Sequence, residues 1–449
     1  MNAAQTKYLT MAVPRYTSYP TVPHFTPETG ATEYEGWLSR LPADRPVSLY
    51  LHVPFCRELC WYCGCNMKLA SRYEPVLAYA KLLQSEIALL AARLPARMVL
   101  SHLHWGGGTP TALKPDDLAA VMATVRQHFD MAPDAEIAIE SDPRTLGDDM
   151  ITRIGALGFN RASFGVQEFD PKVQAAINRI QPADVVGSAV EKLRAAGVGN
   201  INFDLIYGLP FQTVDSLLAT IAACAKIGPD RLALFGYAHV PWMAKKQRLI
   251  PTEALPGPAA RLEMAEMAAA ALQHQGYVPV GLDHFARPQD SLAKAAKAGR
   301  LRRNFQGYTT DSADTLLAVG ATSIGRTPEG FVQNLSETGA WSRSVAAGKL
   351  PIAKGHAFSA DDRLRGQIIE DLMCMGRADV TALQRSLALS DQSLSGELAA
   401  LADYARDGIV TISGGVVAIP QGAQSLVRIV ACVFDSYHKR QVAQHSLAV

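Results

Sequence analysis

Four of the seven cysteines lie in one short segment, Cys56-Arg-Glu-Leu-Cys60-Trp-Tyr-Cys63-Gly-Cys65. Cys56, Cys60 and Cys63 have the spacing C-x3-C-x2-C. Three thiolates on one loop can ligate three irons of a 4Fe–4S cluster, which leaves the fourth iron open to a small-molecule ligand. A structural zinc ion usually needs two separated ligand pairs, and the sequence has no second pair of Cys or His. Cys65 is either a fourth ligand in the absence of substrate or a thiol that merely lies nearby.

The cysteines follow a strand-like run, and other candidate residues also stand where such runs end. Gly106 to Gly108 close one run, and glycine lets a backbone approach a ligand closely because it has no Cβ. Glu140 ends another run, where its carboxylate can accept hydrogen bonds from a ribose. Each feature alone also has a structural explanation, as a turn or as a surface charge. Further polar or small residues at run ends are Gln167, Asp204 and Tyr237-Ala238.

Residues 48 to about 285 alternate between strand-like and helix-like patterns, in about six β–α units. This order predicts a parallel sheet with right-handed crossovers, in a partial (β/α)6 TIM-like barrel that is open on one side. Chemistry in such sheets takes place at the carboxyl ends of the strands. The expected strands are 49–53, 102–108, 136–140, 161–166, 200–206 and 231–235, and the expected helices are 75–94, 116–129, 148–157, 183–196, 213–226 and 258–275.

The predicted domains are an N-terminal arm (1–45), the barrel with an extension (46–355) and a mostly helical C-terminal domain (356–449). The arm lacks periodicity and is expected to be irregular. In the C-terminal domain, helices at 360–375, 379–386, 394–406 and 421–436 and a hairpin turning at Gly414-Gly415 suggest a winged helix. Its candidate recognition stretch, 390–409, carries Asp391, Glu397, Asp403 and Asp407 against Arg406. This acidic stretch would repel phosphate, so a structural or substrate-covering role is favoured over DNA binding.

Charge and hydropathy indicate a protein without a strong attraction to nucleic acid or membrane. Lys and Arg number 43 against 42 Asp and Glu, which gives a net charge of +1. The sequence has neither a signal peptide pattern nor an apolar run of about 18 residues. The odd number of cysteines, crowded together, argues against disulfides and for a reducing compartment. We therefore expect a cytoplasmic protein, and nothing requires more than a monomer.

The cysteine loop after the first strand resembles that of the radical S-adenosylmethionine (radical SAM) enzymes. The aromatic residue before the last ligand, Tyr62, fits the same pattern. The resemblance implies that S-adenosylmethionine chelates the open iron through its amino and carboxylate groups. It also implies that an electron from the reduced cluster cleaves this cofactor to a 5′-deoxyadenosyl radical.

A more specific resemblance is to the oxygen-independent coproporphyrinogen III oxidases, from about residue 14 to the C-terminus. It rests on Pro14-Arg-Tyr-Thr-Ser-Tyr-Pro20, the Cys-Gly-Cys ending at Cys65, His104-Trp-Gly-Gly-Gly-Thr-Pro-Thr111, Asn202-Phe-Asp-Leu-Ile-Tyr-Gly-Leu-Pro210, Asp283-His-Phe-Ala-Arg-Pro288 and Asn304-Phe-Gln-Gly-Tyr-Thr-Thr310. The resemblance implies conversion of coproporphyrinogen III to protoporphyrinogen IX in heme biosynthesis, with two propionates becoming vinyl groups. It implies two S-adenosylmethionine molecules beside one cluster. The first would meet Tyr50, Gly107, Glu140 and Ile324, and the second Tyr62, Gly108, Thr109, Gln167, Arg179, Asp204 and Ala238.

The implied substrate carries four carboxylates, so local cations must hold it because the net charge is small. We expect Arg15 or Arg161, with the arm, to bind propionates. An electron donor for the cluster and a terminal electron acceptor are also required. One alternative is a heme chaperone relative, but such relatives lack the Pro-Arg-Tyr-Thr-Ser-Tyr-Pro segment and usually the Cys-x-Cys ending. A second alternative is a zinc-containing DNA-binding regulator.

Overall fold

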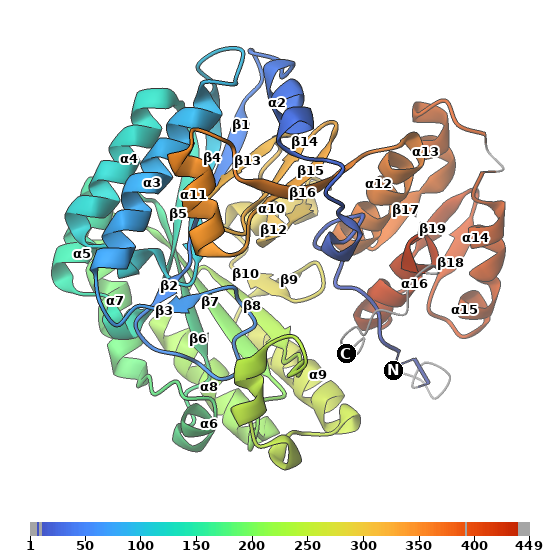
Figure 1. Ribbon diagram of the computed structural model, residues 1–449. Coiled ribbons are helices and arrows are strands. Elements are labelled where there is room, and N and C mark those ends of the chain that lie inside the picture. Colours follow the sequence, from blue (N-terminus) through green and yellow to red (C-terminus); the bar gives the residue numbers. More distant parts are fainter. Residues whose placement is uncertain (1–6, 9–10, 391–392, 439–449) are drawn as a thin grey trace.

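The computed structural model describes residues 7–8, 11–390 and 393–438. A large barrel-like unit carries its helices on the outside, and a smaller lobe formed by the C-terminal residues lies beside it (Figure 1). The first and last described residues both lie at this smaller lobe. In the part of the chain described, no helix is long and apolar enough to cross a membrane.

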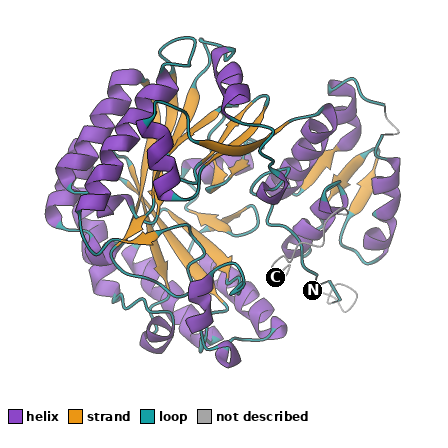
Figure 2. Ribbon diagram, in the orientation of Figure 1, coloured by secondary structure: helices purple, strands orange, loops and turns teal. Residues whose placement is uncertain are grey.

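Six parallel strands alternate with helices and form the barrel, which confirms the predicted fold (Figure 2). Each strand pairs in parallel with the next along the chain, and the helices cover the outer face. The strands are β1 (Val47–Val53), β4 (Val99–Gly107), β5 (Asp130–Ser141), β6 (Arg161–Gln167), β7 (Asn200–Tyr207) and β8 (Arg231–Gly236). The helices are α3 (Glu74–Ala91), α4 (Pro115–His128), α5 (Asp148–Ala156), α6 (Pro171–Ala176), α7 (Ala183–Ala195), α8 (Val214–Ile227) and α9 (Pro258–His274).

The sheet continues beyond both edges of the six-strand core, to twelve strands in all. Next to β1 comes β13 (Leu316–Val319), in parallel, followed by antiparallel β14 (Ile324–Thr327), β15 (Gly330–Asn334) and β16 (Ile352–Ala357). Next to β8 come antiparallel β10 (His284–Ala286) and β9 (Val278–Val280). A separate hairpin joins β11 (Arg302–Asn304) to β12 (Gly307–Thr309), and two further helices are α10 (Ser291–Lys297) and α11 (Thr338–Ala346).

Helix α3 shows how the sequence pattern builds this core. Its predicted apolar stripe is buried against the sheet, as expected for a 3.6-residue period. Glu86 lies on the same face with 1% of its surface exposed. Its carboxylate accepts hydrogen bonds from Gly320 N (2.7 Å), Asn334 Nδ2 (2.6 Å) and Trp341 Nε1 (2.9 Å). A buried carboxylate with three donors thus ties α3 to the turn between β13 and β14, and burial raises its pKa to about 7.

The C-terminal domain keeps the predicted order of helices and hairpin: the first helix has its predicted bounds, the later helices are shorter, and a short strand, Arg377–Asp379, joins the hairpin. Ser359 and Asp362 cap the first helix, as predicted, and both residues of the Gly414-Gly415 turn have positive φ (58° and 82°). The expected helix 394–406 is instead two helices, and the last helix spans seven residues, because a turn at Gly422 with φ 90° precedes it. The elements are α12 (Ala360–Met375), β17 (Arg377–Asp379), α13 (Val380–Ser386), α14 (Ser395–Ala400), α15 (Ala402–Arg406), β18 (Thr411–Ser413), β19 (Val416–Ala418) and α16 (Val427–Val433).

The arm is more ordered than its lack of periodicity predicted. It contains a 3₁₀ turn (Val22–His24) and helix α2 (Ala31–Ser39), whose Tyr34, Trp37 and Leu38 pack on the barrel core. The earlier part belongs to the apolar core of the C-terminal domain through four buried side chains, which are Tyr8, Val13, Tyr16 and Tyr19. A nine-residue helix with three core contacts gives too weak a periodic signal in a Pro-rich segment.

Carboxylates of the acidic stretch 390–409 in the C-terminal domain form ion pairs within the protein. Glu397 pairs with Arg365 at 3.0 Å, Asp407 pairs with Lys7 at 2.7 Å, and Asp403 pairs with Arg406, so three of its four carboxylates have cationic partners. Asp391 lies outside the described residues. These pairs agree with the expectation of a structural role for this face.

Candidate active site

The cysteine loop follows β1 and is fastened to the neighbouring loops of the barrel. Trp61 N donates to the carbonyl of Ile177 at 2.9 Å, and Asn178 Nδ2 donates to the carbonyl of Leu59 at 2.6 Å. Gln247 Nε2 donates to the carbonyls of both Tyr62 (2.8 Å) and Ala238 (3.1 Å). The loop is therefore held over the carboxyl ends of the strands, because each of these partners follows a strand of the barrel.

Two guanidinium groups face the Cys60 thiol. Arg179 Nη1 lies 3.4 Å and Arg144 Nη2 lies 3.6 Å from Cys60 Sγ. Asp142 holds both guanidinium groups, at 2.7 Å from Arg144 and 3.4 Å from Arg179. The sequence reasoning included Arg179 and missed Asp142 and Arg144, although Asp142-Pro-Arg144 directly follows the strand that carries Glu140.

The thiols differ in their electrostatic surroundings. Cys60 is buried, Cys56 and Cys63 are half-buried and Cys65 is exposed. Hydrogen bonding from Cys65, opposed by burial and aided by Lys246 and Arg179, lowers the pKa of Cys63 to about 6. Burial, with the neighbouring thiolates, raises the pKa of Cys56 to about 12. Among the described residues, no three His, Cys, Asp or Glu side chains converge closely enough to hold a single metal ion.

The three glycines at the end of β4, Gly106 and Gly107 in the strand and Gly108 directly after it, have a structural reason that the sequence alone does not show. A Cβ on Gly108 would lie 2.6 Å from the carbonyl oxygen of Phe55, and one on Gly106 would lie 2.8 Å from the Glu140 carboxylate. A Cβ on Gly107 would lie 2.8 Å from the carbonyl oxygen of Val53, and Gly107 has φ 123°. The glycines therefore let the end of β4 pack directly against the segment that leads into Cys56.

The residues expected around the first cofactor lie at one edge of the sheet. Glu140 accepts hydrogen bonds from Gly107 N at 3.2 Å and from His104 Nε2 at 3.0 Å, and the His104 ring stacks on Tyr50 at 5.8 Å. Ile324 begins β14, which runs antiparallel to β13 and so starts at the same edge. The structure adds His104, which the sequence indicates only as part of the motif that begins with it.

Two of the residues expected around the second cofactor are linked to the cysteine loop, since Arg179 donates to Cys60 and Gln247 bridges the carbonyls of Tyr62 and Ala238. The side chains of Gln167 and Arg179 both lie beside Gly165, 2.5 and 3.5 Å from a Cβ built there. Gln167 has φ 66°, so the backbone turns sharply where β6 ends. Gly108 and Thr109 follow β4, and Asp204 faces the barrel interior from β7. Burial, with Glu140 nearby, raises the pKa of Asp204 to about 7.

A cavity of about 460 Å³ opens beside this edge, between the barrel, the arm and the C-terminal domain. Arg15 and Ala238 both line it. Arg161, the other arginine expected to bind propionates, is instead buried in the barrel and paired with Glu136 (3.0 Å) and Asp290 (3.5 Å). Arg161 therefore does not suit this role, because its charge is already neutralised.

Comparisons with known proteins agree with this arrangement. The radical SAM superfamily model matches residues 50–224. Oxygen-independent coproporphyrinogen III oxidase from Bradyrhizobium diazoefficiens is 49% identical over 437 residues, which cover 97% of both chains. The chain belongs to this family of radical SAM enzymes. The family's Escherichia coli K12 enzyme is 38% identical over 95% of this chain and 93% of its own. The solved structure of coproporphyrinogen III oxidase from Escherichia coli, described as a radical SAM enzyme, has 36% identity and a TM-score of 0.91, covering 95% of this chain and all of its own.

The donor set in this family member fits an iron–sulfur cluster and S-adenosylmethionine. Cys56, Cys60 and Cys63 supply three thiols from one anchored loop, and two guanidinium groups beside Cys60 offset their negative charge. Acceptors for an amino group and for hydroxyls are supplied by Glu140 on β5 and Asp204 on β7, which both line the barrel interior. A cluster and S-adenosylmethionine are therefore the cofactors that membership of the radical SAM superfamily implies for this chain.

Proposed function

We propose that the protein converts coproporphyrinogen III to protoporphyrinogen IX without oxygen, in heme biosynthesis. Two propionate side chains each lose carbon dioxide, one hydrogen atom and one electron, and become vinyl groups. Family membership over nearly the whole chain supports this reaction. The observation that carries it is the placement of the cysteine loop and the strand-end polar residues beside a cavity large enough for much of a tetrapyrrole.

The bound cluster and S-adenosylmethionine supply one-electron chemistry that can remove an unactivated hydrogen atom, which no side-chain base can do. The protein's own groups hold and orient the partners. Cys56, Cys60 and Cys63 are proposed to hold the cluster, and Arg144 and Arg179 donate to the Cys60 sulfur. Gln247 donates to the carbonyls of both Tyr62 and Ala238, and Ala238 lines the cavity. These hydrogen bonds support a cysteine loop that lies close to the cavity.

Two S-adenosylmethionine molecules are proposed, one for each decarboxylation. The first is held by Tyr50, Gly107, Glu140 and Ile324 and the second by Tyr62, Gly108, Thr109, Gln167, Arg179, Asp204 and Ala238. Two separate sets of polar residues support this number. In one set, His104 and Gly107 donate to Glu140, and in the other, the side chains of Gln167 and Arg179 lie together beside Gly165. Equilibrium binding with the loaded enzyme measures the number directly, since two equivalents are expected and saturation at one contradicts it.

The remaining partners and the setting are proposals of the same kind. An electron donor reduces the cluster, and an acceptor takes the electron left after each loss of carbon dioxide. A cytoplasmic, monomeric enzyme suits seven free cysteines in a reducing compartment. The division at residues 45/46 and 355/356 remains our proposal, and two separate apolar clusters, one in the barrel and one in the C-terminal domain, support the second boundary.

An anaerobic assay with coproporphyrinogen III, S-adenosylmethionine and a reductant tests the function. Protoporphyrin, measured after oxidation of the product, is expected together with two equivalents of carbon dioxide and with 5′-deoxyadenosine. The matched control is Cys56→Ser, which removes one proposed cluster ligand and is expected to abolish all three products. Release of 5′-deoxyadenosine without vinyl product contradicts the assigned substrate. Stoichiometric heme binding without turnover would instead favour the chaperone alternative, which the comparisons do not support.

A further inference from the structure

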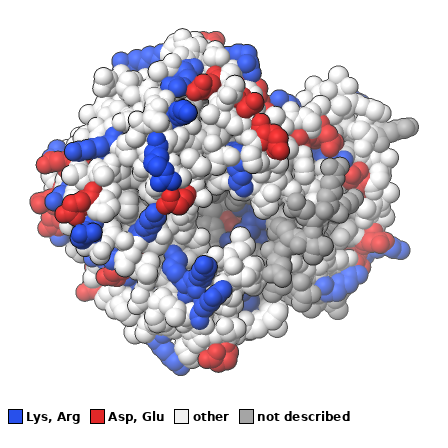
Figure 3. Space-filling view, in the orientation of Figure 1, with Lys and Arg blue, Asp and Glu red and all other residues white. Residues whose placement is uncertain are grey.

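Four arginines from four separate parts of the chain line the 460 Å³ cavity beside the active site. They come from the arm, from α9, from β11 and from α16. We call them the arginine cluster, which consists of Arg15, Arg261, Arg303 and Arg428. In Figure 3, Lys and Arg atoms lie in the shadowed hollow between the barrel and the smaller lobe. The charge therefore gathers at one place although the net charge of the whole chain is only +1.

Acidic residues balance little of this charge, because Asp283 is the only Asp or Glu among the described residues that line the cavity. Arg15 Nη2 donates to the carbonyl of Gly236 at 3.0 Å, and Arg303 Nε donates to the carbonyl of Tyr16 at 3.2 Å. Arg261 lies over the Tyr207 ring at 5.9 Å, and its buried Nε has no hydrogen-bond partner among the described residues. Neutral carbonyls and ring faces orient these guanidinium groups without cancelling their charge.

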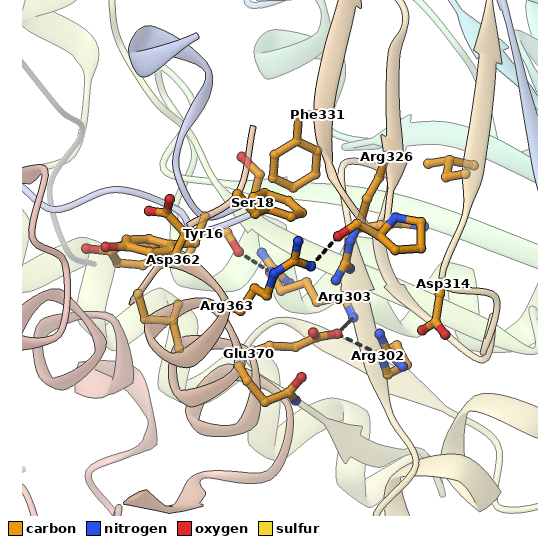
Figure 4. A pocket seen from close by; sticks show the side chains of 18 of the residues that line it. Tyr16, Ser18, Arg302, Arg303, Asp314, Arg326, Phe331, Asp362, Arg363 and Glu370 are labelled. Carbon is orange, nitrogen blue, oxygen red and sulfur yellow. Dashed lines mark hydrogen bonds and ion pairs between the residues drawn. The ribbon is translucent and has the colours of Figure 1, made fainter. Parts of the chain in front are cut away.

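In the other cavities, acidic residues balance the arginines. Figure 4 shows side chains that line a second cavity, of about 480 Å³, which Arg303 also lines. There Arg302 pairs with Glu370 at 2.9 Å, and Arg363 donates to the carbonyl of Pro328. Four acidic residues line that cavity, namely Asp311, Asp314, Asp362 and Glu370. In the barrel interior, Glu136 and Asp290 neutralise Arg161 and Arg231, because each carboxylate pairs with both arginines. Only the cavity beside the active site, among these three, carries a large excess of positive charge.

The cluster is held in place against its own repulsion. Burial, followed by the charge of Arg15, lowers the pKa of Arg428 to about 10. Burial also lowers the pKa of Arg261, with a further contribution from Arg15. Holding like charges together in a partly dry cavity costs free energy, and an anion that enters recovers it. Aromatic side chains complete the wall with flat apolar surface, and they include Tyr207, Phe235, Tyr237, Trp242 and Phe305.

We propose that the arginine cluster binds the carboxylates of a ring-shaped polyanion, with its apolar body against the aromatic wall. This assignment rests on the proposed function, and it names the protein groups that would recognise the four propionates of the substrate. Guanidinium groups suit the task because their planar donors can bind a carboxylate through two parallel hydrogen bonds. Turnover removes two of the four carboxylates, so the product is expected to bind more weakly and to leave.

The test measures anaerobic binding of coproporphyrinogen III to the cluster-loaded enzyme by equilibrium dialysis, with detection after oxidation to the fluorescent porphyrin. The variants are Arg261→Gln and Arg428→Gln, and Arg300→Gln is the control because Arg300 is exposed and lies outside the cavity. Each cluster variant is expected to weaken binding about 10- to 100-fold, as for loss of one charge-assisted hydrogen bond. The control variant is expected to bind like the wild type.

Additional readouts separate the possible failures. Cluster absorbance and the thermal midpoint report whether a variant folds, and Arg261→Lys and Arg428→Lys keep the charge where the Gln variants fail to fold. The Lys variants are expected to retain part of the affinity. If the Gln variants and the Lys variants both bind coproporphyrinogen III as tightly as the wild type, the arginine assignment is wrong, whereas the proposed function still stands. A wild-type enzyme that neither binds nor converts coproporphyrinogen III refutes the proposed function itself.

Discussion

Deletion of residues 1–20 is expected to unfold the C-terminal domain and not merely to remove a substrate contact. The deletion takes four side chains out of that domain's core, with exposures of 8% for Tyr8, 1% for Val13, 4% for Tyr16 and 7% for Tyr19. At about 1.5–3 kcal/mol for each buried side chain, the loss is on the order of 6–12 kcal/mol. This amount is comparable to the whole stability of a typical domain, which is about 5–15 kcal/mol.

Limited proteolysis and thermal unfolding check this prediction. Cleavage within residues 364–434 is expected in the truncated protein and not in the full chain, while the cluster absorbance of the barrel persists. The matched control is Arg15→Gln in the full chain, which keeps all four core side chains and is expected to resist proteolysis. A truncated protein whose C-terminal domain keeps its protease resistance and thermal midpoint would refute the packing argument. Loss of activity on truncation therefore cannot by itself identify Arg15 as a substrate ligand.

Three further substitutions test other contacts. Since burial raises the Glu86 pKa from 4.5 to about 7, wild-type stability falls as pH rises through this range. The free energy of unfolding of the wild type, minus that of the Glu86→Gln variant, is therefore expected to fall by about 3 kcal/mol between pH 5 and pH 8. An equal difference at both pH values would contradict this prediction. Arg144→Gln removes a donor to Cys60 and is expected to lower the reduction potential of the cluster, measured by an EPR titration. An unchanged potential would show that this contact does not affect it. Cys65→Ser should keep full iron and sulfide content if three ligands suffice, and a depleted cluster would make Cys65 a ligand.

The barrel could be predicted from the sequence because its signals are local. The strands carry either a short apolar run or an alternation of apolar and polar residues, as in β7, and helices such as α3 carry an apolar stripe. The succession of these patterns alone indicates a parallel sheet. The cysteine spacing likewise lies within one loop. The carboxyl ends of parallel strands lie at one edge of the sheet, so the sequence offers Glu140 and Asp204 as candidates there, although Asp204 gains weight only from the family resemblance.

The rest depends on contacts between distant residues, which no local pattern reports. Nothing in the sequence distinguishes Arg161, neutralised in the barrel interior, from Arg261, which lines the open cavity. Arg161 begins strand β6 and Arg261 lies in helix α9, and only the positions of Glu136 and Asp290 in the folded chain show that Arg161 is neutralised. The Tyr16 hydroxyl likewise donates to Asp435 at 3.0 Å across 419 residues of sequence. Such pairs become visible only when the fold is known.

The arginine cluster has a consequence for synthesis of the protein. Its members Arg15 and Arg428 lie far apart in the sequence, so the cavity closes only after the chain has left the ribosome as far as α16. The arm emerges long before its packing partners, residues 364–434. Contacts of such long range form late and slowly. An unfinished chain can therefore fold its barrel but lacks the wall that would retain a reactive tetrapyrrole.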